Sequence, residues 1–201
     1  MHKGLRFISV CMLTALSACA TSSIYQDTPP VTETQYDCNI TPRSKIRLKA
    51  EKITYISNYM PLGRAPNVEQ DLLVAPEQLI HKWAENRFVV DGTPDRQVRF
   101  FIKDASITGR SIVTGSVFKQ IMTEYTGRFE ITVQFVESNG HSPVETTLAV
   151  QRSEITPVDL TQAEREHVWM KMTYDMLKSL SAKLGTDSHF CSASFNDYIE
   201  R

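Results

Sequence analysis

Apolar and charged residues alternate along residues 46–51, where single charged residues separate Ile46, Leu48 and Ala50. Successive side chains of a strand point to opposite faces, so this alternation predicts a strand with one buried face. The alternation changes phase at residues 52–56. A shift of one residue would turn the apolar set towards solvent, and we therefore expect a β-bulge near Lys52 that restores the phase.

The same alternation occurs three more times, in residues 98–103, 128–135 and 144–151. Asn139-Gly140 lies between the last two of these segments. Asn-Gly between alternating segments is the strongest short signal for a β-hairpin. We therefore expect these two strands to be antiparallel neighbours.

Two segments have helical periodicity. The first begins at Pro76, which suits the first helical position, and continues with apolar residues at helical spacing: Leu79, Ile80, Trp83 and Ala84. In the second, Thr161 and Glu164 fit a capping box, an apolar stripe follows, and Gly185 suits the C-terminal cap. We expect this helix to cover residues 162–184.

The predicted elements follow the order strand, helix, three strands, helix. This order is typical of the α+β class, with two helices packed on one face of a four-stranded, mainly antiparallel sheet. The first strand, which is joined to the others through a helix, is expected to lie parallel to a neighbour.

Two predicted connections, residues 57–75 and 109–123, are long for a compact domain and unusually apolar for loops. The glycines of the second favour a flexible connection over a phosphate-binding loop, because no helix follows at the required place. The apolar side chains either fold back on the core or contact a partner, and both remain open. The candidate partner surface consists of Met60, Leu62, Leu72, Leu73, Ile112, Val113, Val117 and Phe118.

The N-terminus predicts a signal peptide. Lys3 and Arg6 precede an apolar segment, residues 7–16, that is too short for a permanent membrane span. Leu16-Ser17-Ala18-Cys19 follows directly and resembles the lipobox of bacterial lipoproteins. The resemblance implies that the Cys19 thiol carries a diacylglycerol, that cleavage occurs before Cys19, and that acyl chains such as palmitate hold the protein on a membrane.

Ala20 follows the cysteine, which resembles lipoproteins sorted to the outer membrane and facing the periplasm, with the inner membrane as the alternative. Ordinary signal-peptidase cleavage after Ala20 would instead release a soluble protein.

The anchor, a short tether and this order of elements together resemble small lipoproteins of the Gram-negative envelope. These include the lipopolysaccharide-assembly lipoprotein and the auxiliary lipoproteins of envelope ABC transporters. Residues 82–87 and 99–105 also resemble segments of uncharacterised lipoproteins from alphaproteobacteria. The resemblance implies an accessory role in lipid or lipopolysaccharide transport.

The chain divides into four parts: a signal peptide (1–18), a lipidated cysteine with a tether rich in Thr, Ser and Pro (19–44), the α+β domain (45–185) and a C-terminal tail (186–201). Cys38 and Cys191 remain for a disulfide that ties the tail back, with two free thiols as the alternative.

The mature chain keeps 20 of the 22 basic residues and all 23 acidic ones, which gives a formal charge near −3. This balance argues against a nucleic-acid binder, which would normally have a clustered basic surface, and favours protein, lipid or small-molecule partners.

The sequence offers no catalytic centre. His81 with Glu85, and His167 with Glu164, have helical spacing, but neither pair has a second ligand at a useful distance. Known hydrolase and metal-site motifs are absent from the sequence, so we expect no metal and no cofactor.

The first hypothesis is a non-enzymatic, lipid-anchored accessory or assembly factor that binds an envelope protein complex or lipid. The rivals are a hydrolase that uses a histidine in a surface cleft and a structural lipoprotein of the envelope or of a secretion apparatus.

Overall fold

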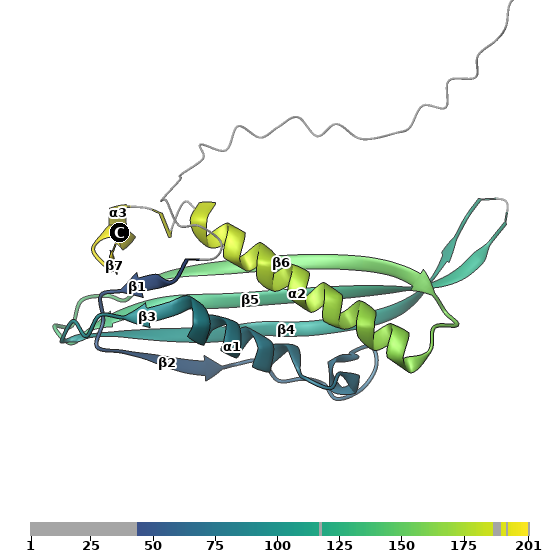
Figure 1. The fold of residues 1–201 in the computed structure, drawn as a ribbon, viewed down its shortest axis with the longest axis horizontal. Coiled ribbons are helices and arrows are strands. Elements are labelled where there is room, and N and C mark those ends of the chain that lie inside the picture. The colour runs from purple at the N-terminus through teal and green to yellow at the C-terminus, as the bar shows by residue number, and fades with distance from the viewer. Residues whose placement is uncertain (1–43, 117, 187–189, 192, 201) are drawn as a thin grey trace, which may run out of the picture. The chain divides into compact units, whose positions relative to one another are not determined.

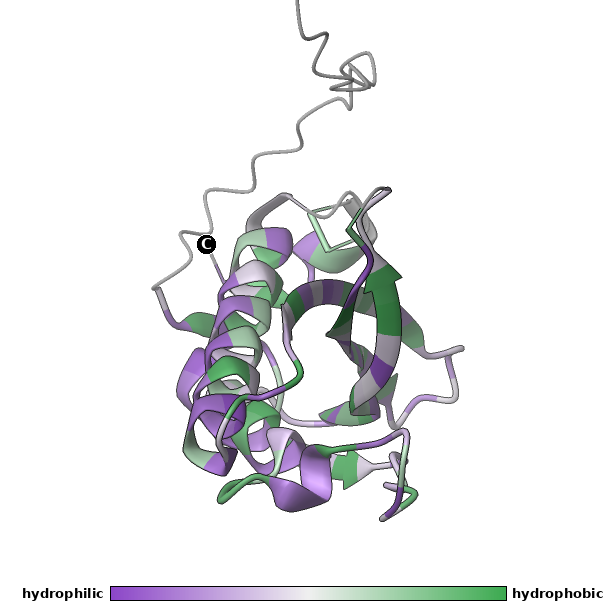
Figure 2. Ribbon diagram, turned by 90° about the vertical axis from the view of Figure 1, so that its right-hand side faces the viewer, coloured by the Kyte–Doolittle hydropathy of each residue, from purple (hydrophilic) through white to green (hydrophobic). Residues whose placement is uncertain are grey.

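The computed structural model describes residues 44–116, 118–186, 190–191 and 193–200. Its main sheet contains, in spatial order, β2 (Lys52–Ser57), β4 (Arg96–Thr114), β5 (Gln120–Glu137) and β6 (Val144–Pro157). β2 is parallel to β4, and the other neighbours are antiparallel. Two helices, α1 (Pro76–Arg87) and α2 (Gln162–Thr186), lie on one face of this sheet (Figures 1 and 2). The predicted α+β class and the predicted hairpin at Asn139-Gly140 are confirmed.

A second sheet of three short strands joins the two ends of the domain. In it, β1 (Ile46–Leu48) lies between β3 (Phe88–Val90) and β7 (Ile199–Glu200). The change of phase at Lys52 is therefore the boundary between β1 and β2, which belong to different sheets, and the predicted bulge is wrong. The chain turns at the boundary, where Ala50 is buried and its N–H donates to Asp91 Oδ1 at 3.1 Å. Each strand can then bury its own apolar residues without a shift of register.

The predicted connection at residues 109–123 is also wrong, because most of it is paired strand. β4 and β5 remain in register as far as Thr114 opposite Gln120. Only the short turn 115–119 joins them, and Gly115 in this turn has φ 88°. The alternation that would have revealed the long strand is interrupted by a register shift between Ile102 and Asp104. Beyond this shift the chain is rich in Ser, Thr and Gly, which resembles a loop in composition.

Two of the glycines in these strands have a packing role. A Cβ atom on Gly109 would lie 2.9 Å from the Tyr125 ring, and one on Gly127 would lie 2.4 Å from Met176 Cε. Both distances are shorter than a normal carbon contact. The absence of side chains therefore lets the Tyr125 ring lie over Gly109 on the neighbouring strand β4, and lets helix α2 pack closely on β5.

Helix α2 begins as the capping box predicts. The Thr161 N–H donates to Glu164 Oε2 at 2.7 Å, and the Glu164 N–H donates to Thr161 Oγ1 at 3.3 Å. Hydrogen bonds from Thr161 lower the pKa of Glu164. The helix ends at Thr186, two residues beyond the predicted end at 184.

The C-terminal segment is part of the core. It contains α3 (Ala193–Asn196) and β7, and its large side chains Phe190, Phe195 and Ile199 are buried. Phe195 packs edge-on against Phe135 of β5, with ring centroids 5.8 Å apart. Apolar packing therefore fastens this segment to the domain. The predicted disulfide stays a prediction, because Cys38 lies outside the described residues.

Arg96 adds a polar contact between the sheet and this segment. Its Nη1 donates to the Asp197 carbonyl at 2.9 Å, and its guanidinium lies 4.3 Å from the centre of the Tyr198 ring. Arg96 also forms an ion pair of 2.7 Å with Glu137. Hydrogen bonds from Asn139, Arg96 and His141 lower the pKa of Glu137 to about 2.

The buried tail predicts that Phe195→Ala destabilises the whole domain. Loss of a buried phenylalanine leaves a cavity, so the free energy of unfolding should fall by about 3–5 kcal/mol. Urea denaturation followed by circular dichroism measures it. Asp197→Ala, an exposed change in the same segment, is the control and should be nearly neutral. A neutral result for Phe195→Ala would mean that the tail does not contribute to the core.

The ion pair at Arg96 predicts a pH-dependent effect of Glu137→Gln. The pKa of Glu137 falls from 4.5 to about 2 in the folded protein, so its carboxylate stabilises the fold above pH 4.5. This contribution disappears as the pH falls through about 2. The difference in unfolding free energy between wild type and Glu137→Gln should therefore shrink between neutral and strongly acidic pH. A difference that stays constant over this pH range would contradict the prediction.

Candidate functional site

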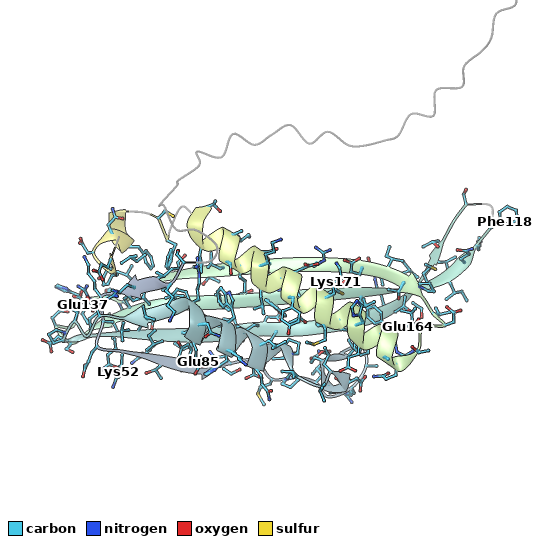
Figure 3. The ribbon with its side chains drawn as sticks, in the orientation of Figure 1. Lys52, Glu85, Phe118, Glu137, Glu164 and Lys171 are labelled. Atoms are coloured by element: carbon cyan, nitrogen blue, oxygen red, sulfur yellow. The ribbon has the colours of Figure 1, made fainter. Side chains whose placement is uncertain are left out.

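Exposed apolar side chains gather on a hairpin arm at one end of the main sheet. β6 ends at Pro157, opposite Met122, and residues 113–121 continue beyond it as this two-stranded arm (Figure 1). Phe118 is 85% exposed and lies at the tip of the arm (Figure 3). Val113 and Ile121 are directly opposite each other and are both exposed. The arm therefore presents three large apolar side chains to solvent.

A second group of exposed apolar side chains lies on residues 58–75, which we call the anchored loop. Met60 is 85% exposed and Leu73 is 88% exposed, and Leu62 between them is also exposed. These side chains do not fold back on the core. They stay exposed because other contacts along the loop hold its backbone in place.

The loop is held first by backbone hydrogen bonds to β4. β2 ends at Ser57, opposite Ile102, so the edge of β4 beyond this point has no strand beside it. The loop covers part of this edge: the Val68 N–H donates to the Ile107 carbonyl at 2.9 Å, and the Gly109 N–H donates to the Pro66 carbonyl at 2.8 Å. The loop thus satisfies backbone groups of the sheet that β2 does not reach.

A buried carboxylate provides the second attachment. Glu69, in the short 3₁₀ helix η1 (Glu69–Asp71), is only 3% exposed. The Tyr59 hydroxyl and Asn67 Nδ2 both donate to Glu69 Oε1. The N–H groups of Val68 and Ile107 donate to Oε2 at 3.1 and 3.4 Å. Four donors from the loop and from β4 therefore compensate the burial of one charge.

The Tyr59 hydroxyl is the donor from the first part of the loop in this arrangement. A phenol is protonated at physiological pH, and burial, together with the hydrogen bond and the charge of Glu69, raises the pKa of Tyr59 further. Its hydroxyl fixes the first part of the loop, next to the exposed Met60.

Leu72 and Leu73, though adjacent in sequence, point in opposite directions. Leu72 is 8% exposed and packs in a cluster with Tyr125 and Trp169, so its inclusion in the partner surface is corrected. The Leu73 N–H donates to Glu166 Oε1 of α2 at 3.1 Å, which leaves the Leu73 side chain outside. A core contact and a helix contact therefore fix the end of the loop.

The other predicted surface residues divide in a similar way. Met60, Leu62, Leu73, Val113 and Phe118 are exposed. Ile112 is half-buried, and Val117 lies outside the described residues.

The predicted partner surface leaves out four further exposed side chains: Ile121, which belongs to the same apolar segment as Val113 and Phe118, and Ile155, Val158 and Tyr174. The sequence could have revealed Ile155. Successive residues of a strand point to opposite faces, and Ile155 is an odd number of residues from the buried Leu148 and Val150, so its side chain lies on the exposed face of β6.

His81 lies in a surface cleft of about 380 Å³ beside the edge strand β2. Ser57, Tyr55 and Glu77 also line this cleft, so the residue types of a hydrolase are present. However, His81 Nδ1 lies 3.6 Å from Glu85 Oε1, longer than the hydrogen bond of an acid–base pair, and its ring packs on Tyr55 with centroids 4.6 Å apart. The cleft therefore brings a histidine, a serine and a carboxylate to one part of the surface, where the contacts of His81 are with Glu85 and Tyr55.

The other histidines offer less. His141 is exposed in the β5–β6 turn, with Nδ1 3.3 Å from Glu137 Oε2, and His167 is exposed on α2. His189 lies outside the described residues. Among the residues that the structure describes, no group of three His, Cys, Asp or Glu side chains could hold a metal ion. None of the described helices has the length and apolar character needed to cross a membrane.

Comparisons with known proteins give no assignment. No protein-family model matches the sequence, and no curated protein matches it. Solved structures with some similarity include a minor lipoprotein from Acinetobacter baumannii, with 13% identity, a TM-score of 0.33 and coverage of 67% of this chain and 92% of the other. Rare lipoprotein B from Shewanella oneidensis has 9% identity, a TM-score of 0.35 and coverage of 66% and 89%. A DUF330 protein from Xanthomonas campestris has 8% identity, a TM-score of 0.38 and coverage of 76% and 91%.

The buried carboxylate predicts that Glu69→Gln loosens the anchored loop. An amide has one acceptor oxygen in place of two, so its NH2 group would face donors that now bind a carboxylate. We expect the free energy of unfolding to fall by about 3 kcal/mol and the amides of residues 59–73 to exchange faster with solvent. Hydrogen exchange by mass spectrometry measures the second effect. Asp71→Asn, an exposed change in the same 3₁₀ helix, should leave both unchanged, and normal protection in Glu69→Gln would contradict the prediction.

Proposed function

We propose that this protein is a lipid-anchored domain of the bacterial cell envelope that faces the periplasm and docks on an envelope protein complex as an accessory or assembly factor. In this proposal Cys19 carries the lipid and the outer membrane is the membrane concerned. The docking surface consists of the hairpin arm and the outward side chains of the anchored loop. The protein recognises a partner and catalyses no reaction.

The observation that carries the proposal is the exposure of large apolar side chains on ordered backbone. Phe118 and Leu73 are almost fully exposed, although the arm is a paired hairpin and the loop is fixed by Glu69. Leaving such a side chain in water forgoes about 1.5–3 kcal/mol relative to burial. Contact with a partner would recover this free energy, and ordered loops on a rigid frame commonly serve such contacts.

The N-terminal sequence supports the anchor. Lys3 and Arg6, the apolar segment 7–16 and Leu16-Ser17-Ala18-Cys19 together have the pattern of a lipoprotein signal. Restriction to a membrane surface would raise the local concentration of a membrane-bound partner, so a modest apolar surface suffices for docking.

Site-specific photocrosslinking tests the docking surface. A benzoylphenylalanine residue at Phe118 or at Leu73 should give a discrete adduct with one envelope protein in intact cells. The same residue at Lys52, exposed on edge strand β2, should give none. Val113→Ser combined with Phe118→Ser should abolish the adduct formed from position 73, while the melting temperature stays unchanged because both side chains are exposed.

Equal adducts from all three positions, or an adduct that persists in the double variant, would contradict docking through this surface. A structural lipoprotein without a specific partner would give diffuse adducts or none. Mass spectrometry of the crosslinked band identifies the partner, and intact-mass analysis of the native protein checks the acylation of Cys19.

A further inference from the structure

A groove between the two helices forms a second site, on different elements from the apolar arm and loop. Its volume is about 420 Å³, within the range of small-molecule sites. Helix α1 contributes Leu79, Lys82 and Trp83, and helix α2 contributes Tyr174, Leu177 and Lys178. Tyr174 is 56% exposed, so the groove is open to solvent along one side.

The floor of this groove is apolar because its polar groups bind one another. Trp83 Nε1 donates to Ser181 Oγ at 2.8 Å, and Ser181 Oγ in turn donates to the Leu177 carbonyl at 3.0 Å. The amide of Asn86, also at the groove, donates to the Lys82 carbonyl at 2.9 Å. Most of the remaining surface is aromatic and aliphatic carbon from Leu79, Trp83, Tyr174 and Leu177, which suits an acyl chain.

The charges at this groove are of one sign. Lys82 and Lys178, one from each helix, are the charged residues that line it, and neither forms an ion pair within the described part of the chain. Lys171 on the same helix differs, because its Nζ lies 3.0 Å from Asp175 Oδ2. Two acids on these helices pair with other residues: Asp175 with Lys171 and Arg152, and Glu85 with His81. Together with the hydrogen bond from Lys171, the charge of Lys178 also helps to lower the pKa of Asp175, although Lys178 and Asp175 form no ion pair in the described residues.

We propose that this groove binds an acyl lipid with a phosphate head group. The chain lies over Trp83 and Leu177, and the phosphate lies between the ammonium groups of Lys82 and Lys178. A phosphate suits this place because it presents several strong acceptor oxygens, and two lysines on different helices can share them. The apolar floor suits the acyl chain and the two lysines suit the anionic head group. The combination is specific to an amphiphile, whereas an apolar floor or a pair of lysines alone occurs on many protein surfaces.

Calorimetric titration of the full chain tests the site with lipids kept below their micellar concentration. The probes are myristoyl-lysophosphatidic acid, monomyristoylglycerol with the same chain and no phosphate, and inorganic phosphate without a chain. We expect the first to bind with a one-to-one stoichiometry and at least about tenfold more tightly than either of the others. Equal binding of the two lipids would overturn the proposal.

Matched variants locate the site. Lys82→Gln combined with Lys178→Gln should weaken binding of the lysophosphatidic acid about tenfold or more, while Lys171→Gln should not. Phe118→Ser should also leave binding unchanged; loss of binding in this variant would place the lipid on the hairpin arm and overturn the proposal. Unchanged binding of the lysophosphatidic acid in the double lysine variant would also overturn the proposal.

Tryptophan fluorescence gives an independent readout. The protein has two tryptophans, and Trp169 is buried whereas Trp83 lines the groove. In Trp169→Phe, emission should therefore report Trp83 alone and should shift to shorter wavelength when the acyl chain covers the indole. Absence of a shift at saturating lipid would contradict the proposed position of the chain.

Discussion

The antiparallel ladder between β4 and β5 is the constraint on which the rest of the structure depends. It runs from Arg96 opposite Glu137 to Thr114 opposite Gln120, so one pair of strands passes through the whole domain and on into the arm. Near its start the ladder holds the C-terminal segment through Arg96, and near its middle Gly127 admits Met176 of α2. Further along, the Ile107 N–H helps to hold Glu69. Positions along one ladder therefore determine where the core, the anchored loop and the arm lie.

The buried Glu69 illustrates how a polar group can specify a conformation. A carboxylate removed from water is costly unless donors surround it, and here the donors come from both the loop and β4. The loop therefore has one arrangement in which all of these groups are satisfied, and any slip would leave a charge without partners. This explains how a segment with outward-facing Met60 and Leu73 can remain ordered although few of its apolar side chains are buried.

Local patterns in the sequence predicted much of the fold, and long-range contacts account for the rest. The capping box at Thr161, the hairpin at Asn139-Gly140 and the start of α1 at Pro76 depend on neighbouring residues, and each is found in the structure. The small sheet was missed because β1 finds its partners at Phe88 and Ile199, far away along the chain. The segment that begins at Gly109 was predicted to be a loop because its glycines gave no reason for a strand. The structure supplies the reason: Gly109 makes room for the Tyr125 ring, and Gly127 makes room for Met176, and neither pair is close in sequence. For the candidate site, exposure of Phe118 could be suspected from sequence, but Leu72 and Leu73 differ only through their contacts with the core and with Glu166.

The small sheet also affects when the domain can form. β1 begins the described part of the chain and β7 is almost its last segment, yet the two are hydrogen-bonded to each other. A polypeptide that is still emerging from the ribosome lacks β7 and the aromatic rings that precede it. Ile46 and Leu48 then have no antiparallel partner strand beside them, and the core next to Phe135 stays open. The small sheet and the core beside Phe135 can therefore close only once Phe195, Ile199 and Glu200 are available.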